Sequence, residues 1–145
     1  MPHLDTTREK FRAFRAFQRD GPINMLNLVR LRDQAIYPDD IGHGPVTGAE
    51  AYAAYGRESA PIMEKVGGRV VWRAAMELML IGPDDDEQWD HMFIVEYPSV
   101  DAFVAMVKDP DYQNAVIHRI AAVADSRLVR TRPLSAGANF ADAGD

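Results

Sequence analysis

The chain has 145 residues, of which 47% are hydrophobic and 26% charged, a composition typical of a single globular domain. Its net charge is -6 and its Lys and Arg residues are scattered, which argues against a nucleic-acid-binding protein. The absence of cysteine excludes disulfides, thiolate chemistry and Cys-based metal sites. The N-terminal stretch lacks the apolar core of a signal peptide, and no run approaches about 20 apolar residues. We therefore expect a cytoplasmic protein with neither nucleic-acid nor membrane partners.

Residues 1–20 are predicted to form a helical extension ahead of the main domain. Thr6 and Glu9 have the spacing of a capping box. The helix they open carries an aromatic stripe, more typical of a core or interface face than of a ligand site: Phe11, Phe14 and Phe17. The next element, Ile23–Arg32, is predicted to be a strand. Asn24 and Asn27 are three residues apart in it, so they should face opposite sides of the sheet.

The middle of the chain predicts a helix followed by a long strand. Thr47 and Glu50 form a second capping-box pattern ahead of a helix over residues 48–66. Gly56 and Pro61 interrupt this helix, so a kink or a break into two pieces is expected. Gly67 and Gly68 then provide a turn into a strand over residues 69–81, in which Val70 and Trp72 would share one face.

The last third predicts a strand, two helical pieces and a final strand. Residues 89–97 form the strand, Pro98 ends it, and Ser99 caps the following helix. Asp109 and Pro110 start a second helix, residues 126–131 form a short last strand, and a loosely held tail covers residues 134–145. The order predicts an α+β, ferredoxin-like βαββαβ domain over residues 21–133. The sheet face without helices is apolar, so a second copy of the chain is expected to cover it.

Three segments together resemble the bacterial family called domain of unknown function 1330 (DUF1330), within the dimeric α/β-barrel superfamily. They read INMLNLVRLRD, YGRESAPIMEKVGGRVVW and EYPSVDAFVAMVKDPDYQNAVIHRIAAVADSRLVRTRP. The resemblance implies a homodimer in which two sheets form one α/β barrel, with the N-terminal helix as an addition. It implies no settled activity. Relatives in the wider superfamily include cofactor-free monooxygenases, lactone isomerases and haem-degrading enzymes.

His91 is the first candidate for chemistry. Strand alternation puts it on one face with four apolar residues, namely Trp89, Phe93, Val95 and Tyr97. A histidine in such a setting can deprotonate a phenolic or enolic molecule near neutral pH. Asn24 or Asn27 could polarise a carbonyl. In the simpler interpretation His91 is solvated beside Asp90 and each Asn satisfies a backbone group.

A second group of residues could line an apolar pocket and bind substrate. It comprises Trp72, Trp89, Tyr97, Tyr55 and Tyr112. Arg119 could hold a substrate carboxylate, or form a structural ion pair with Asp125. His118 is expected to be a surface histidine, and His43 a solvated loop histidine. No metal-binding motif is present, and we expect no cofactor.

Three functional hypotheses follow. In the first, a homodimeric barrel binds, and either oxidises or isomerises without a metal, a small aromatic or enolizable molecule. In the second, the protein is a non-catalytic ligand-binding or dimer-scaffold protein. The third is a haem-binding or haem-degrading enzyme. Which strand faces line the interior depends on the register, because a shift of one residue exchanges the two faces.

Overall fold

The computed structural model describes residues 2–137 and 140–142, with a four-stranded antiparallel sheet at its centre. The strands are β1 (Ile23–Leu31), β2 (Arg69–Ala74), β3 (His91–Tyr97) and β4 (Val123–Thr131). They are ordered β2-β3-β1-β4 across the sheet, and every neighbouring pair is antiparallel. With a helical connection between β1 and β2 and another between β3 and β4, this is the predicted ferredoxin-like α+β arrangement.

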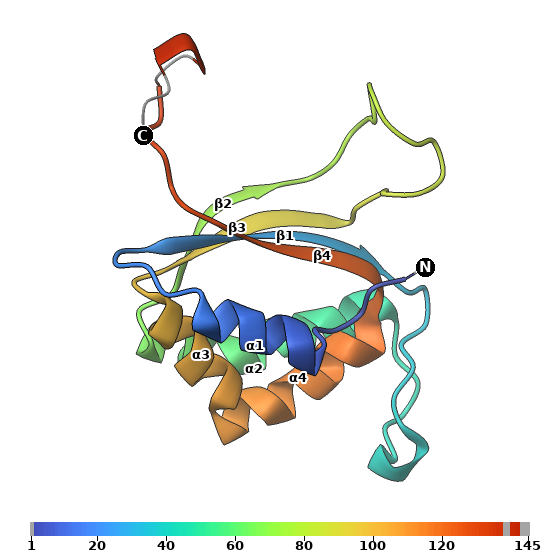
Figure 1. Cartoon of the computed structure of the whole chain (residues 1–145). Coiled ribbons are helices and arrows are strands. Elements are labelled where there is room, and N and C mark those ends of the chain that lie inside the picture. The colour runs from blue at the N-terminus through green and yellow to red at the C-terminus, as the bar shows by residue number, and fades with distance from the viewer. Residues whose placement is uncertain (1, 138–139, 143–145) are drawn as a thin grey trace.

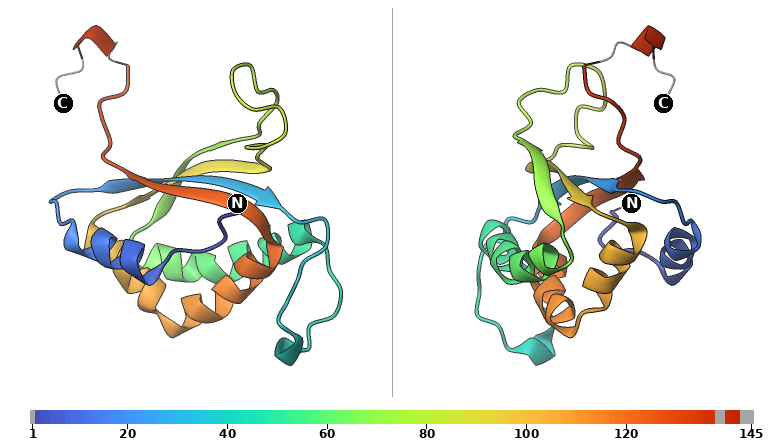
Figure 2. Two further views of the ribbon diagram at one scale, coloured as in Figure 1. Left: turned by 45° about the vertical axis from the view of Figure 1, so that its right-hand side comes forward. Right: turned by 90° about the vertical axis from the view of Figure 1, so that its left-hand side faces the viewer.

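All four helices cover one face of the sheet (Figures 1 and 2). They are α1 (Arg8–Ala16), α2 (Gly48–Lys65), α3 (Val100–Lys108) and α4 (Pro110–Ala122), with short 3₁₀ turns at Asp39–Ile41 and Phe140–Asp142. The connection between β2 and β3 and the C-terminal segment rise from the opposite face. In the described part of the chain, no helix is both long and apolar enough to cross a membrane.

Polar caps start the helices close to where the sequence predicts. Thr47 and Glu50 form a complete capping box on α2. The Ser99 side chain accepts from the Ala102 N–H at the start of α3, and Asp109 caps α4 with Pro110 at its first position. These caps satisfy N–H groups that the first helical turn leaves without partners.

The hydrophobic core lies between the sheet and the helices. The sheet contributes Ile23 and Met25 of β1 and Val95 and Tyr97 of β3. The helices contribute Ile62 of α2 with Val100, Phe103 and Met106 of α3. Val29 of β1 is also fully buried. We call this side of the sheet the helix face.

The other side, the open face, carries an apolar row across all four strands. Trp72 of β2 lies opposite Ile94 of β3, which lies opposite Leu26 of β1, which lies opposite Val129 of β4. Trp72 is 43% exposed and Val129 is 47% exposed. The predicted apolar face without helices is therefore present.

The predicted strand over residues 69–81 is wrong in its second half, because β2 ends at Ala74. Ala74 pairs with Met92 almost at the start of β3, so later residues have no partner strand. Their alternating apolar pattern instead places large exposed side chains on the β2–β3 connection: Leu78, Leu80 and Ile81. The register also shifts between Val70 and Trp72. Val70 pairs with Val95 on the helix face and Trp72 with Ile94 on the open face, so they do not share a face as predicted.

Other predicted boundaries need smaller corrections. The N-cap of α1 is Thr7, whose side chain accepts from the Lys10 N–H, and not Thr6. Helix α2 runs through the exposed Pro61 as one element, so the helix is not broken into two pieces there. Strand β3 starts at His91 and not at Trp89. Strand β4 starts three residues before Ser126. In the predicted tail, residues 138, 139 and 143–145 lie outside the described part.

Candidate functional site

His91 stands at the start of β3 on the helix face, where its ring meets an aromatic residue of α2. The His91 and Tyr52 rings are stacked, with centroids 5.1 Å apart and planes 20° apart. Burial lowers the pKa of His91 below its usual value; the nearby Asp90 carboxylate opposes this and the Arg73 charge adds to it. The imidazole is therefore neutral near pH 7 and has a ring nitrogen able to accept a proton.

Three tyrosines extend from His91 toward α4. Tyr52 and Tyr55 of α2 have ring centroids 5.5 Å apart, and the Tyr55 and Tyr112 hydroxyl oxygens are 2.9 Å apart. We call Tyr52, Tyr55, Tyr112 and His91 the tyrosine–histidine cluster. Burial is the main cause that raises the pKa of both Tyr52 and Tyr112. These phenols therefore stay protonated near pH 7, and either hydroxyl of the Tyr55–Tyr112 pair can be the donor, so that His91 is the base of the cluster.

Arg119 adjoins the cluster but is engaged with the N-terminal segment. Its positive charge acts to lower the pKa of Tyr52 and Tyr112, against the effect of burial. Its guanidinium donates to the Leu4 carbonyl oxygen at 2.7 Å and to the Ser126 hydroxyl at 3.3 Å. Asp125, its expected ionic partner, instead pairs with Arg127 at 2.8 Å. Arg119 therefore fastens the segment before α1 to β4.

The two asparagines lie on opposite faces, as predicted. Asn27 pairs with Phe93 on the helix face that also carries His91, and its Nδ2 donates to the Met25 carbonyl oxygen at 3.0 Å. Asn24 pairs with Glu96 on the open face. Its buried Oδ1 accepts no hydrogen bond from the residues that the structure describes. Only Asn27 therefore shares a face with His91.

The remaining aromatic candidates are dispersed. Tyr97 lies on the core side of the cluster; its ring packs edge-on against Phe103, and its hydroxyl donates to the Met106 sulfur at 3.5 Å. Trp72 lies on the open face. Trp89 precedes β3, and the Arg127 guanidinium lies 5.3 Å from its ring centre. Trp89 also lines a shallow groove of about 360 Å³ with Arg30, Leu31, Met76, Glu77, Gln88 and Asp90. The structure therefore connects Tyr55 and Tyr112 to His91 through Tyr52, with Arg119 beside the tyrosines, but it does not bring in the two tryptophans.

Two features of the structure were not predicted from the sequence. Tyr52 was not among the predicted site residues, although its three-residue spacing from Tyr55 puts both on one side of α2. The second feature is a chain of polar contacts. The Tyr37 hydroxyl lies 2.6 Å from His118 Nδ1, and His118 Nε2 lies 2.9 Å from Glu58. The His43 ring stacks on Tyr37 with centroids 4.0 Å apart and is exposed in a loop, as expected, whereas His118 is partly buried and is not the surface histidine expected. No local sequence pattern predicts these contacts, because their residues come from three separate segments. These are the connection between β1 and α2, helix α2 and helix α4.

Across residues 2–137 and 140–142, no group of three or more His, Asp or Glu side chains comes together as metal ligands would.

Comparison with known proteins gives a family and a fold. Two crystal structures of the protein RPA0582, one of them a methylated form and one described as a protein of unknown function from Rhodopseudomonas palustris, are each 61% identical to this chain. The methylated form covers 94% of this chain and 98% of its own, with a TM-score of 0.89; the other covers 93% and 99%, with a TM-score of 0.87.

A NIPSNAP-like domain protein from Burkholderia xenovorans is 17% identical, covers 83% of this chain and 92% of its own, and has a TM-score of 0.50, a similarity of fold alone. No protein with a curated description matches the chain. The model of the family described as domain of unknown function (DUF1330) matches residues 41–131, and the chain therefore belongs to that family.

Proposed function

We propose that the chain forms a homodimer through the open face of its sheet and that each subunit binds a small aromatic or enolizable molecule beside His91. In this proposal His91 takes a proton from the bound molecule. The observation that carries the site is the stacking of a neutral, half-buried imidazole on Tyr52, on the sheet face that also bears Asn27.

The dimer proposal rests on the apolar surface of the open face. The row from Trp72 to Val129 crosses all four strands, and the β2–β3 connection beside it exposes 76% of Leu78, 85% of Leu80 and 92% of Ile81. Monomers seldom expose a continuous apolar surface of this size.

The ligand proposal follows from the chemistry of the cluster. An aromatic or enolizable molecule can stack on Tyr52 or His91, because stacked rings attract each other. Neutral His91 can accept a proton from a phenolic hydroxyl or from a carbon next to a carbonyl. Asn27 has a second amide N–H that could donate to the substrate oxygen where negative charge develops. Reprotonation at another carbon would isomerise the molecule, whereas electron transfer to dioxygen would oxidise it.

Acetophenone is a suitable probe because it is both aromatic and enolizable. We expect the protein to accelerate exchange of its methyl protons in D₂O, measured by NMR, and His91→Gln to abolish the acceleration. His3→Gln removes an exposed histidine and serves as the matched control. In parallel, only the His91 ring signals should move when acetophenone is added to histidine-labelled protein. Exchange that survives in His91→Gln would contradict the proposed role.

The same experiment separates catalysis from binding alone. If acetophenone perturbs the His91 signals without faster exchange, the cluster is a ligand-binding site and the second hypothesis is the better one. The haem hypothesis has a weaker structural basis. A haem would need an axial histidine, and His118 of α4, a candidate for that role, has both ring nitrogens engaged with Tyr37 and Glu58.

A further inference from the structure

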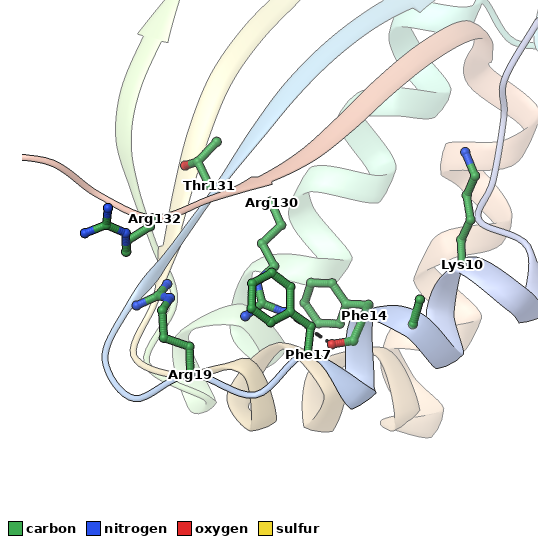
Figure 3. A pocket seen from close by; sticks show the side chains of 8 residues that line it. Lys10, Phe14, Phe17, Arg19, Arg130, Thr131 and Arg132 are labelled. Atoms are coloured by element: carbon green, nitrogen blue, oxygen red, sulfur yellow. Dashed lines mark hydrogen bonds between the residues drawn. The ribbon is translucent and has the colours of Figure 1, made fainter. Parts of the chain in front are cut away.

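A second groove lies between α1 and the end of β4. None of its lining residues belongs to the tyrosine–histidine cluster. Its volume is about 330 Å³, and it is broadly open to solvent. Figure 3 shows how its side chains are arranged; the lining residues are Lys10, Ala13, Phe14, Phe17, Arg19, Arg130, Thr131 and Arg132. Helix α1 precedes residue 41, where the family match begins, so one wall of this groove comes from outside the matched domain.

The charge of the groove is opposite to that of the chain. Four of its eight lining residues are Lys or Arg and none is acidic. The whole chain has 22 acidic and 16 basic residues. Burial, and then repulsion from Arg19, lowers the pKa of Arg130. Gathering like charges in this way destabilises the empty protein, and a bound anion would offset the cost.

Arg130 is held in place but is only partly satisfied. Its guanidinium carbon lies 4.2 Å from the centre of the Phe17 ring and 5.1 Å from that of Phe14. Its Nη1 donates to the Phe14 carbonyl oxygen at 3.2 Å. Its Nη2 is buried and donates to no residue that the structure describes. A charged donor without an acceptor is a costly feature in a folded protein and points to an acceptor supplied from outside.

The neighbouring groups define what that acceptor would be attached to. Phe17 is 62% exposed and covers the Arg130 guanidinium, so a turn of this ring would open a path to Nη2. Phe14 is packed against Phe103 of the core and gives a fixed apolar wall. Arg19 is fixed as well, since it donates to the Asp20 and Pro22 carbonyl oxygens at 3.0 and 2.9 Å. The groove thus combines a preorganised cation with aromatic surface.

We propose that this groove binds a small organic anion, with its carboxylate or phosphate group at Arg130 and its apolar part against Phe14 and Phe17. Arg presents paired donors that suit the oxygens of either group. The limited volume of the groove suits a molecule of about one or two rings and not a long polyanion. This site shares no lining residue with the tyrosine–histidine cluster.

Isothermal titration calorimetry of the full chain tests the proposal with four probes: phenylacetate, phenyl phosphate, inorganic phosphate and the neutral benzyl alcohol. We expect at least one aromatic anion to bind about tenfold more tightly than benzyl alcohol, and more tightly than inorganic phosphate. The ratio between phenylacetate and phenyl phosphate identifies the preferred anionic group. Binding of the preferred aromatic anion should weaken as sodium chloride is added, because salt screens exposed charges.

Variants then place the site. Arg130→Gln should weaken binding of the preferred probe about tenfold, and Lys10→Gln should weaken it less, since Lys10 lies at the exposed margin. Arg12→Gln removes an exposed charge from the same helix without touching the groove and should have no effect. His91→Gln should also leave binding unchanged.

Three results would overturn the proposal: no binding of either aromatic anion at millimolar concentration, equal binding of benzyl alcohol, or equal effects of Arg12→Gln and Arg130→Gln. Because Arg130 also holds α1, each variant is first compared with the wild type by thermal unfolding. Lys10→Gln keeps the test valid if Arg130→Gln does not fold, since the Lys10 side chain lies in an exposed position.

Discussion

Replacing Trp72 with alanine tests whether the open face joins two subunits. Trp72 is 43% exposed in the single chain, and a tryptophan side chain can present about 250 Å². A partner would therefore cover about 110 Å² on each subunit, worth about 2.7 kcal/mol at about 25 cal/mol per Å². The substitution occurs in both subunits, and the alanine methyl group keeps part of the contact, so we expect a loss of about 4 kcal/mol per dimer. This corresponds to a dissociation constant about 1,000-fold weaker.

Sedimentation equilibrium of the wild type and Trp72→Ala over a range of protein concentrations measures this change. Val70→Ala is the matched control. Val70 is 44% exposed on the same strand, but the register shift between Val70 and Trp72 leaves Val70 on the helix face. Circular dichroism checks that each variant is folded. The open face is not the interface if Trp72→Ala dimerises as tightly as the wild type, or if Val70→Ala weakens the dimer by the same factor.

Three further predictions concern stability and are measured by urea unfolding. The lowered pKa of His91 means that the folded state takes up fewer protons there than the unfolded state, so stability should fall from about pH 7 to about pH 5, and His91→Gln should flatten this dependence. Tyr37→Phe removes the hydroxyl bonded to His118 and should cost about 1 kcal/mol, with faster hydrogen exchange in the connection between β1 and α2. Thr47→Ala breaks the capping box with Glu50 and should cost about 1 kcal/mol. A flat pH profile in the wild type, or unchanged unfolding in either other variant, would contradict the respective argument.

Local chemistry made much of the fold predictable. The caps at Thr47, Ser99 and Asp109 act through hydrogen bonds to residues two or three positions away, so the sequence alone contains both partners. The opposite orientation of Asn24 and Asn27 follows from the two-residue period of a strand and was confirmed by the register.

The errors arise where distant residues decide the outcome. The apolar alternation beyond Ala74 has the period of a strand, but a strand also needs a paired neighbour, and β3 provides none there. The register shift near Val71 likewise depends on how β2 meets β3.

The candidate site depends on tertiary contacts even more strongly. Nothing near His91 in the sequence indicates that Tyr52, 39 positions earlier, stacks on its ring. The Arg119 contact with the Leu4 carbonyl also joins distant segments. The sequence could therefore nominate His91 as a base, but it could not supply the neighbours that determine its chemistry.

Native mass spectrometry of freshly purified protein, under conditions that preserve small bound molecules, is the most direct test of the homodimer with a ligand site in each subunit. We predict a species at twice the 16.2 kDa chain mass, with further mass on that species when acetophenone is added. A species at the single-chain mass at micromolar concentration would contradict the pairing through the open face. A dimer that gains no mass with acetophenone and shows no perturbation of His91 would contradict the ligand site.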